Sequence, residues 1–329
     1  MRKKVLIITV YLILIFMILA GCSNKKLTNQ SEMTTEIEPS TAPSVLDRDQ
    51  SVYFNCITTD GLSAYSLTQV LYEQPEIKKS IIFEYSIYNN YELIKSAFVS
   101  DKVNIAILPF KLATDLLLEF DNYKLLGVVK GENHILVGIS SYVELYGKEI
   151  VIFDPSGFDG AFMTTIERIQ YETNLLGINY GEDYTVKIVK TIEEMNSLKE
   201  SQVGLIDFHT LNLEMFKVFK DSNLFVEIDE SEDFQIAVLM KDSIIDIYPD
   251  VATSFIEVYY RSCLWLSAYP ERAKAYATQL NLTKLLYEDK TFYYFDASDE
   301  QKTLENLLLV IGYNTLESQK IMNLIYESN

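Results

Sequence analysis

The chain has 329 residues, of which 48% are hydrophobic, and it contains only 12 Gly and 7 Pro. This is enough for one large domain or two moderate ones with real cores. The formal net charge is −19, and such a surface is repelled by nucleic-acid phosphates and by anionic lipid headgroups. We therefore expect no nucleic-acid partner and no electrostatic attachment to a membrane.

The first 21 residues predict an exported chain. A positively charged Met-Arg-Lys-Lys start is followed by an almost unbroken apolar run at residues 5–19. That run is shorter than the about 20 residues that a helix needs to cross a bilayer. A charged start, a short apolar core and small residues before a cleavage point are typical of a secretory signal peptide. The alternative is an uncleaved N-terminal anchor helix.

Leu19-Ala20-Gly21-Cys22 resembles the lipobox of bacterial lipoproteins. In that family the Cys thiol is acylated, with palmitate among the acyl chains, and the chain is cut before it. The resemblance implies that Cys22 is the lipidated N-terminus and that the protein is held at the extracytoplasmic face of the cell membrane. Removing residues 1–21 leaves 25 Lys and Arg against 47 Asp and Glu, a net charge of −22. Attachment would therefore depend on the lipid alone.

Residues 22–50 predict a flexible tether, because they are rich in Thr, Ser, Glu and Asn and lack apolar periodicity. Cys56 and Cys263 lie in apolar or helical segments and are interpreted as buried free thiols, with one disulfide between them as the alternative. The sequence has no C-x-x-C and only His134 and His209 as histidines, so we expect no zinc site and no cofactor.

From residue 51 onward, short apolar runs alternate with segments of helical periodicity. The runs predict strands at residues 52–57, 81–85, 103–108, 125–129 and 135–139. Helices are predicted between them at residues 63–72, 91–99 and 110–118. This alternation is typical of an α/β fold with a mostly parallel sheet and helices on both faces.

The same pattern then repeats. Strands are predicted at residues 149–153, 184–189, 203–207, 224–228 and 236–240, and helices at residues 159–176 and 192–199. The chain is helical from Pro249, since Pro249 and Pro270 suit the first turn of a helix. Ser298 with Gln301 predicts a capping box, and Gly312 predicts the end of that helix.

Four segments, in order between residues 51 and 280, resemble the solute-binding lipoproteins of bacterial ABC importers. They are Val103–Pro109, Tyr142–Phe153, Ser197–Ile206, and Tyr248–Val251 together with Trp265 and Tyr269–Ala273. Asn104 and Gly204 stand where the family has Asp, and Ser201-Gln202 where it has Gly. The nearest branch is that of the sulfonate, taurine, nitrate and thiamine-precursor binding proteins.

The resemblance implies a type II periplasmic binding protein, in which two α/β lobes are joined by two crossovers. We place the crossings near Ile139 and Ile236, so that lobe 1 comprises residues 51–139 and 236–329 and lobe 2 comprises residues 140–235. The implied function is delivery of a small organic solute by cleft closure. The implied partners are ABC permease subunits with their cytoplasmic ATPase, and the protein itself would be a monomer.

In open α/β sheets the ligand lies off the carboxyl ends of the strands. That position selects a set of ligand-binding candidates: Thr58, Thr59, Asp60, Tyr85, Pro109, Ser156, Phe158, Asp159 and Phe208.

The helix starts that follow residues 60 and 159 would face each other, and bare helix N-termini favour an anion. However, Asp60 and Asp159 occupy those turns, either as N-caps or as carboxylates in the cleft, and no Lys or Arg follows these strands. Carboxylates in the cleft favour an aminopyrimidine-like or other amine-bearing or heteroaromatic solute over a sulfonate or nitrate.

Two other functional classes remain open. A surface lipoprotein could sense a solute and dock to a receptor without any transport. A pyrimidine-synthase-like enzyme uses the same fold, and His209 after a strand is the one candidate general base. The sequence has no G-x-S-x-G, no H-E-x-x-H and no glycine-rich phosphate loop, so we expect reversible binding and no catalytic residues.

Overall fold

The computed structural model describes residues 52–78, 81–131, 134–154, 162–207, 225–228, 233–282 and 292–327. The chain from Asp49 onward forms one compact unit. The predicted signal peptide, Cys22 and the predicted tether lie outside the described residues.

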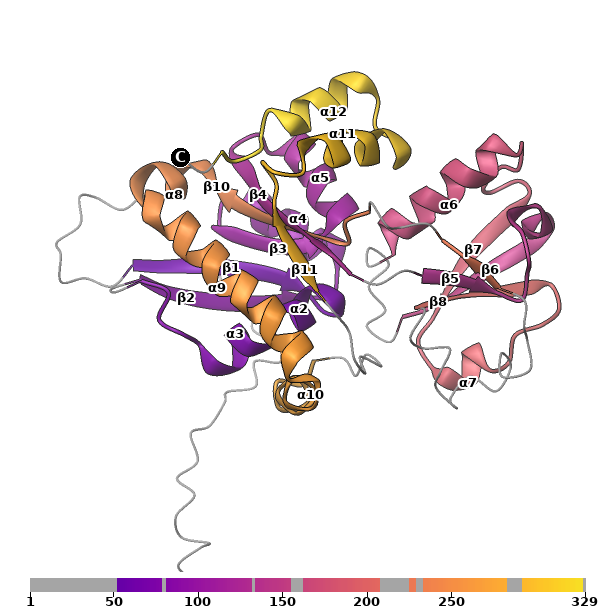
Figure 1. Ribbon diagram of the computed structural model, residues 1–329, viewed down its shortest axis with the longest axis horizontal. Coiled ribbons are helices and arrows are strands. Elements are labelled where there is room, and N and C mark those ends of the chain that lie inside the picture. The colour runs from indigo at the N-terminus through magenta and orange to yellow at the C-terminus, as the bar shows by residue number, and fades with distance from the viewer. Residues whose placement is uncertain are drawn as a thin grey trace, which may run out of the picture. The chain divides into compact units, whose positions relative to one another are not determined.

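A six-stranded sheet, called here the first sheet, has the strand order β11-β4-β10-β3-β1-β2 (Figure 1). Its strands are β1 (Val52–Thr59), β2 (Ile81–Tyr88), β3 (Ile105–Pro109), β4 (Tyr123–Lys130), β10 (Ile236–Lys241) and β11 (Tyr293–Asp296). β1 pairs in parallel with β2 and β3, whereas β10 is antiparallel to both β3 and β4, and β11 is antiparallel to β4. The strands β1 to β4 thus run in one direction, as predicted for a mostly parallel sheet, and β10 and β11 run against them.

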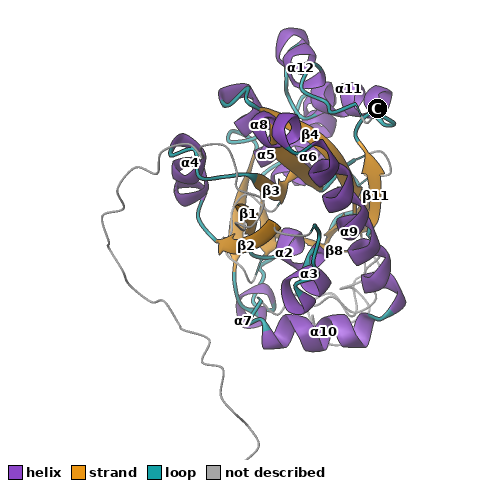
Figure 2. Cartoon of the chain, turned by 90° about the vertical axis from the view of Figure 1, so that its left-hand side faces the viewer, coloured by secondary structure: helices purple, strands orange, loops and turns teal. Residues whose placement is uncertain are grey.

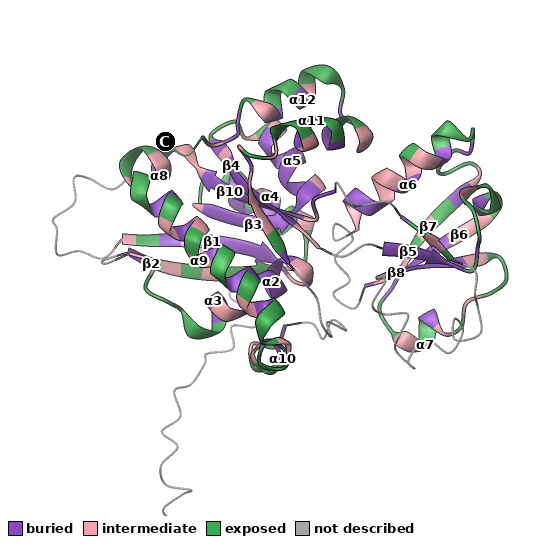
Figure 3. Ribbon diagram, viewed as in Figure 1, coloured by how far each residue is buried: buried purple, intermediate pink, exposed green. Residues whose placement is uncertain are grey.

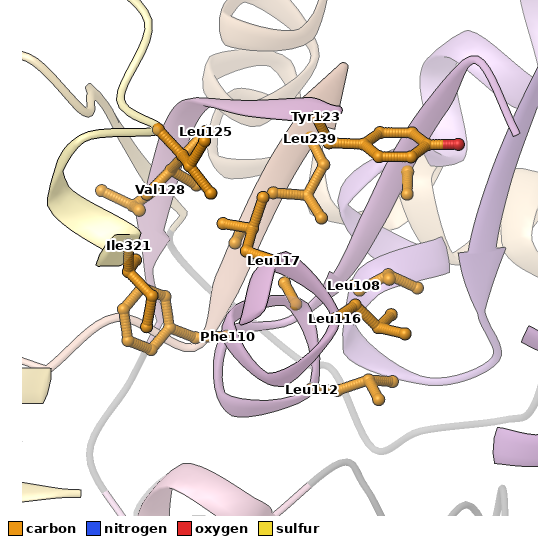
Figure 4. Packing of buried hydrophobic residues seen from close by; sticks show 14 of the residues in the cluster. Leu108, Phe110, Leu112, Leu116, Leu117, Tyr123, Leu125, Val128, Leu239 and Ile321 are labelled. Atoms are coloured by element: carbon orange, nitrogen blue, oxygen red, sulfur yellow. The ribbon is translucent and has the colours of Figure 1, made fainter. Parts of the chain in front are cut away.

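Alternate residues of the first sheet point to opposite faces, because side chains alternate along a strand. Ala106 and Leu108 of β3 join one buried cluster, and Ile105 and Ile107 join another. Figure 4 shows the first cluster around α5, with Leu112, Leu116 and Leu117 against Leu108, Tyr123 and Leu239. The central strands β3 and β10 are almost wholly buried (Figure 3).

Helices cover both faces of the first sheet, as predicted (Figure 2). The first cluster receives α4 (Tyr91–Val99), α5 (Phe110–Glu119), α11 (Gln301–Val310) and α12 (Thr315–Met322). The second receives α2 (Leu62–Ser66), α3 (Thr68–Glu73), α8 (Asp242–Ile247), α9 (Pro249–Ala268) and α10 (Pro270–Gln279).

A five-stranded sheet, called here the second sheet, has the order β7-β6-β8-β5-β9. Its strands are β5 (His134–Val137), β6 (Lys148–Phe153), β7 (Tyr184–Val189), β8 (Gln202–Asp207) and β9 (Phe225–Glu227). The helices between them are the 3-10 helix η1 (Tyr142–Leu145), α6 (Met163–Leu175) and α7 (Ile192–Met195). β6 is parallel to β7 and β8, and β5 is antiparallel to β8 and β9. Ile169 of α6 packs on one face and Met195 of α7 on the other.

The first crossing between the sheets comes earlier than the sequence predicts. Residues 135–139 were expected on the near side of a crossing at Ile139, but β5 pairs with β8 and β9 of the second sheet. The crossing falls between Lys130 and His134. The apolar runs of β4 and β5 look alike, and periodicity alone does not say which sheet a strand joins. The chain returns to the first sheet at β10, which begins at Ile236.

Most helix boundaries follow local sequence signals. Pro249 and Pro270 open α9 and α10, and Gly312 follows α11 with a φ of 94°, all as predicted. The capping box at Ser298 is wrong, because α11 begins at Gln301 after Glu300 with no side-chain cap. Residues 297–300 form a turn instead, in which Glu300 N donates to the Ala297 carbonyl at 3.3 Å.

Cys56 and Cys263 are buried free thiols, as predicted, and no disulfide joins them. Within the described ranges, no helix is long and apolar enough to cross a membrane. In the same part of the chain, no group of three or more His, Cys, Asp or Glu side chains could hold a metal ion.

Candidate functional site

The carboxyl ends of β1 to β4 meet at one edge of the first sheet, because these strands run in the same direction. β10 and β11 run the other way, so they begin at this edge. Ile236 lies opposite both Pro109 and Val129, and Tyr293 lies opposite Lys130. Ligands of open α/β sheets bind at such an edge.

The second sheet has a corresponding edge. β6, β7 and β8 end there, and β5 begins there, with His134 opposite Asp207. Both crossings run from one of these edges to the other. Lys130 and His134 are four residues apart, so their Cα atoms are at most about 14 Å apart. Chain connectivity therefore holds these two sheet edges close together at this point.

Three of the predicted ligand residues lie at the end of β1: Thr58 and Thr59 are its last two residues, and Asp60 follows it. Thr58 and Thr59 are each only 1% exposed, and Thr58 Oγ1 lies 3.5 Å from the Thr59 carbonyl oxygen, to which it donates. The Asp60 carboxylate accepts a hydrogen bond from Gly61 N at 2.8 Å, and Asp60 N donates to the Tyr88 carbonyl at 3.1 Å. Asp60 is not the N-cap of α2, since Gly61 occupies that position with a φ of 97°. A positive φ there favours glycine.

Two buried hydroxyls of the first sheet and its helices have no hydrogen-bond partner among the described residues. One belongs to Tyr85, a predicted ligand residue, whose ring stacks on Phe83 with centroids 6.5 Å apart. The sequence placed Tyr85 at a strand end, but β2 continues to Tyr88, and Tyr85 lies inside the strand opposite Cys56. Burial raises the pKa of Tyr85, with the nearby Cys56 adding to the effect, so the phenol stays neutral. The other belongs to Ser63, in the first turn of α2, and the sequence analysis missed it. An unpaired buried hydroxyl costs about 1–3 kcal/mol, which a hydrogen bond from a solute would recover.

The predicted residue Pro109 closes β3, and α5 begins immediately after it. Phe110 N donates to the Gln235 carbonyl at 2.9 Å, and Lys111 N donates to Thr164 Oγ1 at 3.3 Å. Thr164 lies in the first turn of α6. We expected the helix starts after residues 60 and 159 to face each other, and the contact in the structure is between the first turns of α5 and α6.

A basic side chain stands at the edge of the first sheet, contrary to expectation. Lys130 ends β4, and its ammonium lies 5.3 Å from the ring centroids of both Phe234 and Phe295. Such cation–π contacts hold a charged group over aromatic rings. The signal was present in the sequence, because Lys130 directly follows the apolar run at residues 125–129.

The edge of the second sheet is described in part. The predicted ligand residues Ser156, Phe158, Asp159 and Phe208 lie outside the described residues, as does the candidate base His209.

His134, which begins β5, is described. Its Nδ1 lies 3.1 Å from Thr165 Oγ1, and its ring centroid lies 5.0 Å from that of Phe162. Arg168 of α6 makes a two-pronged ion pair with Asp233 of the second crossing, with Nε 3.0 Å from Oδ2.

No protein-family model matches the chain, and no curated protein sequence matches it. Solved structures do. The periplasmic aliphatic sulphonate binding protein SsuA from Escherichia coli aligns with a TM-score of 0.59 at 10% identity, over 84% of this chain and 92% of that one. The alkanesulfonate-binding protein SsuA from Xanthomonas axonopodis pv. citri, bound to MOPS, gives 0.54 at 11% identity over 84% and 96%.

A third match is the conserved Candida albicans CA3427 gene product, which exhibits the generic periplasmic binding protein structural fold. It gives a TM-score of 0.50 at 10% identity, over 83% of this chain and 95% of that one. Identities this low show the fold alone. The chain has the periplasmic binding protein fold, and its structural neighbours include periplasmic binding proteins of ABC transporters.

Proposed function

We propose that this protein is an extracytoplasmic solute-binding lipoprotein that delivers a small organic solute to an ABC importer. The observation that carries the proposal is the edge-to-edge connection of the two sheets: each crossing joins the edge where the parallel strands of one sheet end to the corresponding edge of the other. Each sheet with its helices is one lobe: lobe 1 contains the first sheet and lobe 2 the second. The solute binds between the two edges, and closure of the lobes presents it to the permease.

The proposed solute contacts in lobe 1 are Thr58, Thr59, Asp60, Tyr85 and Pro109, with Ser63 and Lys130 added by the geometry. Those in lobe 2 are Ser156, Phe158, Asp159 and Phe208. Of the lobe 1 residues, Thr58, Thr59, Pro109 and Lys130 end their strands and Asp60 follows β1, which is the position that α/β sheets use for ligands, whereas Tyr85 lies within β2.

The charges at the edge of the first sheet define the solute class. The Asp60 carboxylate favours an amino group, and the Lys130 ammonium favours an acidic one. Aromatic rings at the same edge, such as Phe295 beside Lys130, favour a flat or heteroaromatic solute. We propose an amine-bearing or heteroaromatic organic solute. Sulfonates also belong to the candidate solutes, because the Lys130 ammonium at this edge can pair with an anion.

Attachment to the membrane is proposed through a lipid on Cys22, with residues 23–50 as the tether. The support is the lipobox-like Leu19-Ala20-Gly21-Cys22 behind a charged and apolar leader. A multiply acylated Cys anchors stably, whereas one acyl chain holds weakly. Loss of fatty-acid labelling in Cys22→Ala is the expected result, and equal labelling of that variant would contradict the assignment.

Reversible binding without turnover is tested by a thermal-shift screen of the protein against taurine, alkanesulfonates, nitrate, aminopyrimidines, riboflavin and cationic amines. A solute at a hundredfold excess over its Kd stabilises the protein by about 2.7 kcal/mol. Ser63→Ala should reduce that stabilisation, while Ser100→Ala, a matched change at the end of α4, should not. Failure of every solute class, or chemical conversion of the bound solute, would contradict the proposal.

A further inference from the structure

The junction between the two lobes contains an acidic side chain, Glu167, that forms no ion pair with any residue that the structure describes. α5 of lobe 1 and α6 of lobe 2 meet at their first turns, where Lys111 N donates to Thr164 Oγ1. About one turn further along, Asp115 of α5 and Glu167 of α6 bring two carboxyl groups to the same junction.

Within the described part of the chain, Lys111 is the cation whose charge favours ionised Glu167, and it is already engaged. Lys111 Nζ lies 2.7 Å from an Asp115 carboxylate oxygen and 4.5 Å from the ring centroid of Tyr313. Asp115 also accepts a hydrogen bond from the Tyr313 hydroxyl at 2.6 Å. Lys111, Asp115 and Tyr313 therefore contact one another on lobe 1, and Glu167 of lobe 2 is not part of this cluster.

Glu167 makes neither an ion pair nor a hydrogen bond from its side chain within the described part of the chain. It is half-buried, and a Cβ built on Gly312 would lie 3.7 Å from its Oε2. The charge of Lys111 of α5 lowers the pKa of Glu167, and that of Asp115 raises it. The charge of Glu167 in turn raises the pKa of Tyr313 and of Tyr184 of β7. Its helix neighbour Arg168 is paired with Asp233.

We propose that Glu167 is a proton-sensitive switch of the contact between α5 and α6, and that it regulates solute binding at the proposed site. The inference rests on the proposed function only for its effect on the solute. When Glu167 is neutral the junction is stable. When Glu167 is ionised the junction is weakened, because its charge is half-buried and is disfavoured by the negative charge of Asp115. Both helices begin at the ligand-binding edges, so their contact sets how closely those edges approach.

The direction of the pH effect follows from the environment of Glu167. Burial raises the pKa of its carboxyl group, Lys111 partly offsets this, and Asp115 adds to it. The contact is therefore fully favoured below the ordinary Glu pKa, and that advantage is lost as the pH rises through the raised pKa. Each unit of pKa difference changes the ratio of closed to open junctions about tenfold.

The test is a distance measurement on the solute-free protein. Spin labels are placed on Leu175→Cys at the end of α6 and Leu309→Cys of α11, both exposed. The full chain carries Cys22→Ser, and the buried Cys56 and Cys263 are protected from the label. Between about pH 5 and about pH 8, the population at short distance should fall several-fold. Glu167→Gln should keep it constant, and Glu172→Gln on the same helix should behave like the parent chain.

The proposal is overturned if the parent chain shows no pH dependence or if Glu167→Gln retains it. Asp115→Asn is a second variant that keeps Glu167 and frees Lys111 to pair with it, so the transition should move to lower pH. For any solute found in the thermal-shift screen, the affinity should be higher at the lower pH in the parent chain and independent of pH in Glu167→Gln. Because the distances need no solute, a failed screen counts against the transport function and leaves the switch to be judged separately.

Discussion

The first and second sheets have the same design on different scales. The first sheet lies between two large buried clusters that include Phe255 and Tyr259 on one face and Phe110 and Tyr123 on the other. The second sheet lies between two smaller clusters, built mainly from Ile, Leu and Val. Burial of apolar area is the main stabilising term in folding, so the first sheet should supply most of the stability.

The same difference extends to the candidate site. The first sheet places Thr58 and Thr59 on the buried strand β1 and the partly buried Tyr85 on its outer strand β2. The second sheet contributes His134 at a strand start, which was not among the predicted ligand residues, and the predicted ligand residues of this sheet lie outside the described residues. The candidate solute contacts that the structure describes therefore come mainly from the first sheet.

The largest expected effect is a matched pair of core substitutions, one in each sheet. Leu239→Ala of β10 and Leu136→Ala of β5 both remove a fully buried Leu side chain. We expect a cost of about 4–5 kcal/mol for Leu239→Ala and about 2–3 kcal/mol for Leu136→Ala, since the larger cluster leaves a bigger residual cavity. Urea unfolding followed by circular dichroism measures both. Equal costs would show that the two sheets are equally packed.

The next effect concerns the ion pair that links the second crossing to α6. Arg168→Ala leaves the Asp233 carboxylate, whose side chain is 1% exposed, without its guanidinium partner. The expected loss is about 3 kcal/mol, because removing one partner of a buried ion pair is strongly destabilising. Arg261→Ala, which breaks an exposed pair with Glu257, is the control and should cost under about 1 kcal/mol. Similar losses of unfolding free energy in the two variants would show that the ion pair at the second crossing contributes no more than an exposed pair.

A third difference is visible at alkaline pH. Burial raises the pKa of Tyr65 to about 12, with Glu271 adding to the effect. The neutral phenol is therefore worth about 2–3 kcal/mol of stability below pH 10, which is lost as the pH rises toward 12. Tyr65→Phe should flatten the stability profile in this range. Tyr184→Phe in the second sheet should do so less, because the Thr173 hydrogen bond opposes the effect of burial on the Tyr184 pKa. A profile unchanged by Tyr65→Phe would refute the assignment.

The smallest effect is a chemical one. Cys56 and Cys263 both lie in the cluster on one face of the first sheet, and burial raises the pKa of the Cys263 thiol to about 12. Neither should react with a thiol reagent in the folded protein, since the thiolate is the reactive form. Their slow labelling therefore reports on opening of the first sheet alone. Rapid labelling under native conditions would contradict this, because it would show that the cluster opens far more often than the unfolding free energy of the protein allows.

Sequence patterns determined the local elements of this protein. The helix at residues 91–99 and the strand at residues 184–189 have the predicted bounds, because apolar periodicity and the cap residue Asn90 are local signals. The same reasoning placed Thr58, Thr59, Asp60 and Pro109 at strand ends, which the topology brings to one edge.

Only the tertiary structure decided which strands share a sheet and which side chains meet. The assignment of β5 to the second sheet, the reversed direction of β10 and the contact between α5 and α6 depend on pairings between distant residues, and no local pattern encodes them. Lys130 and Ser63 were visible in the sequence as residue types. Their place at the candidate site followed only from the sheet order and from the burial of a hydroxyl, both of which are properties of the packed chain.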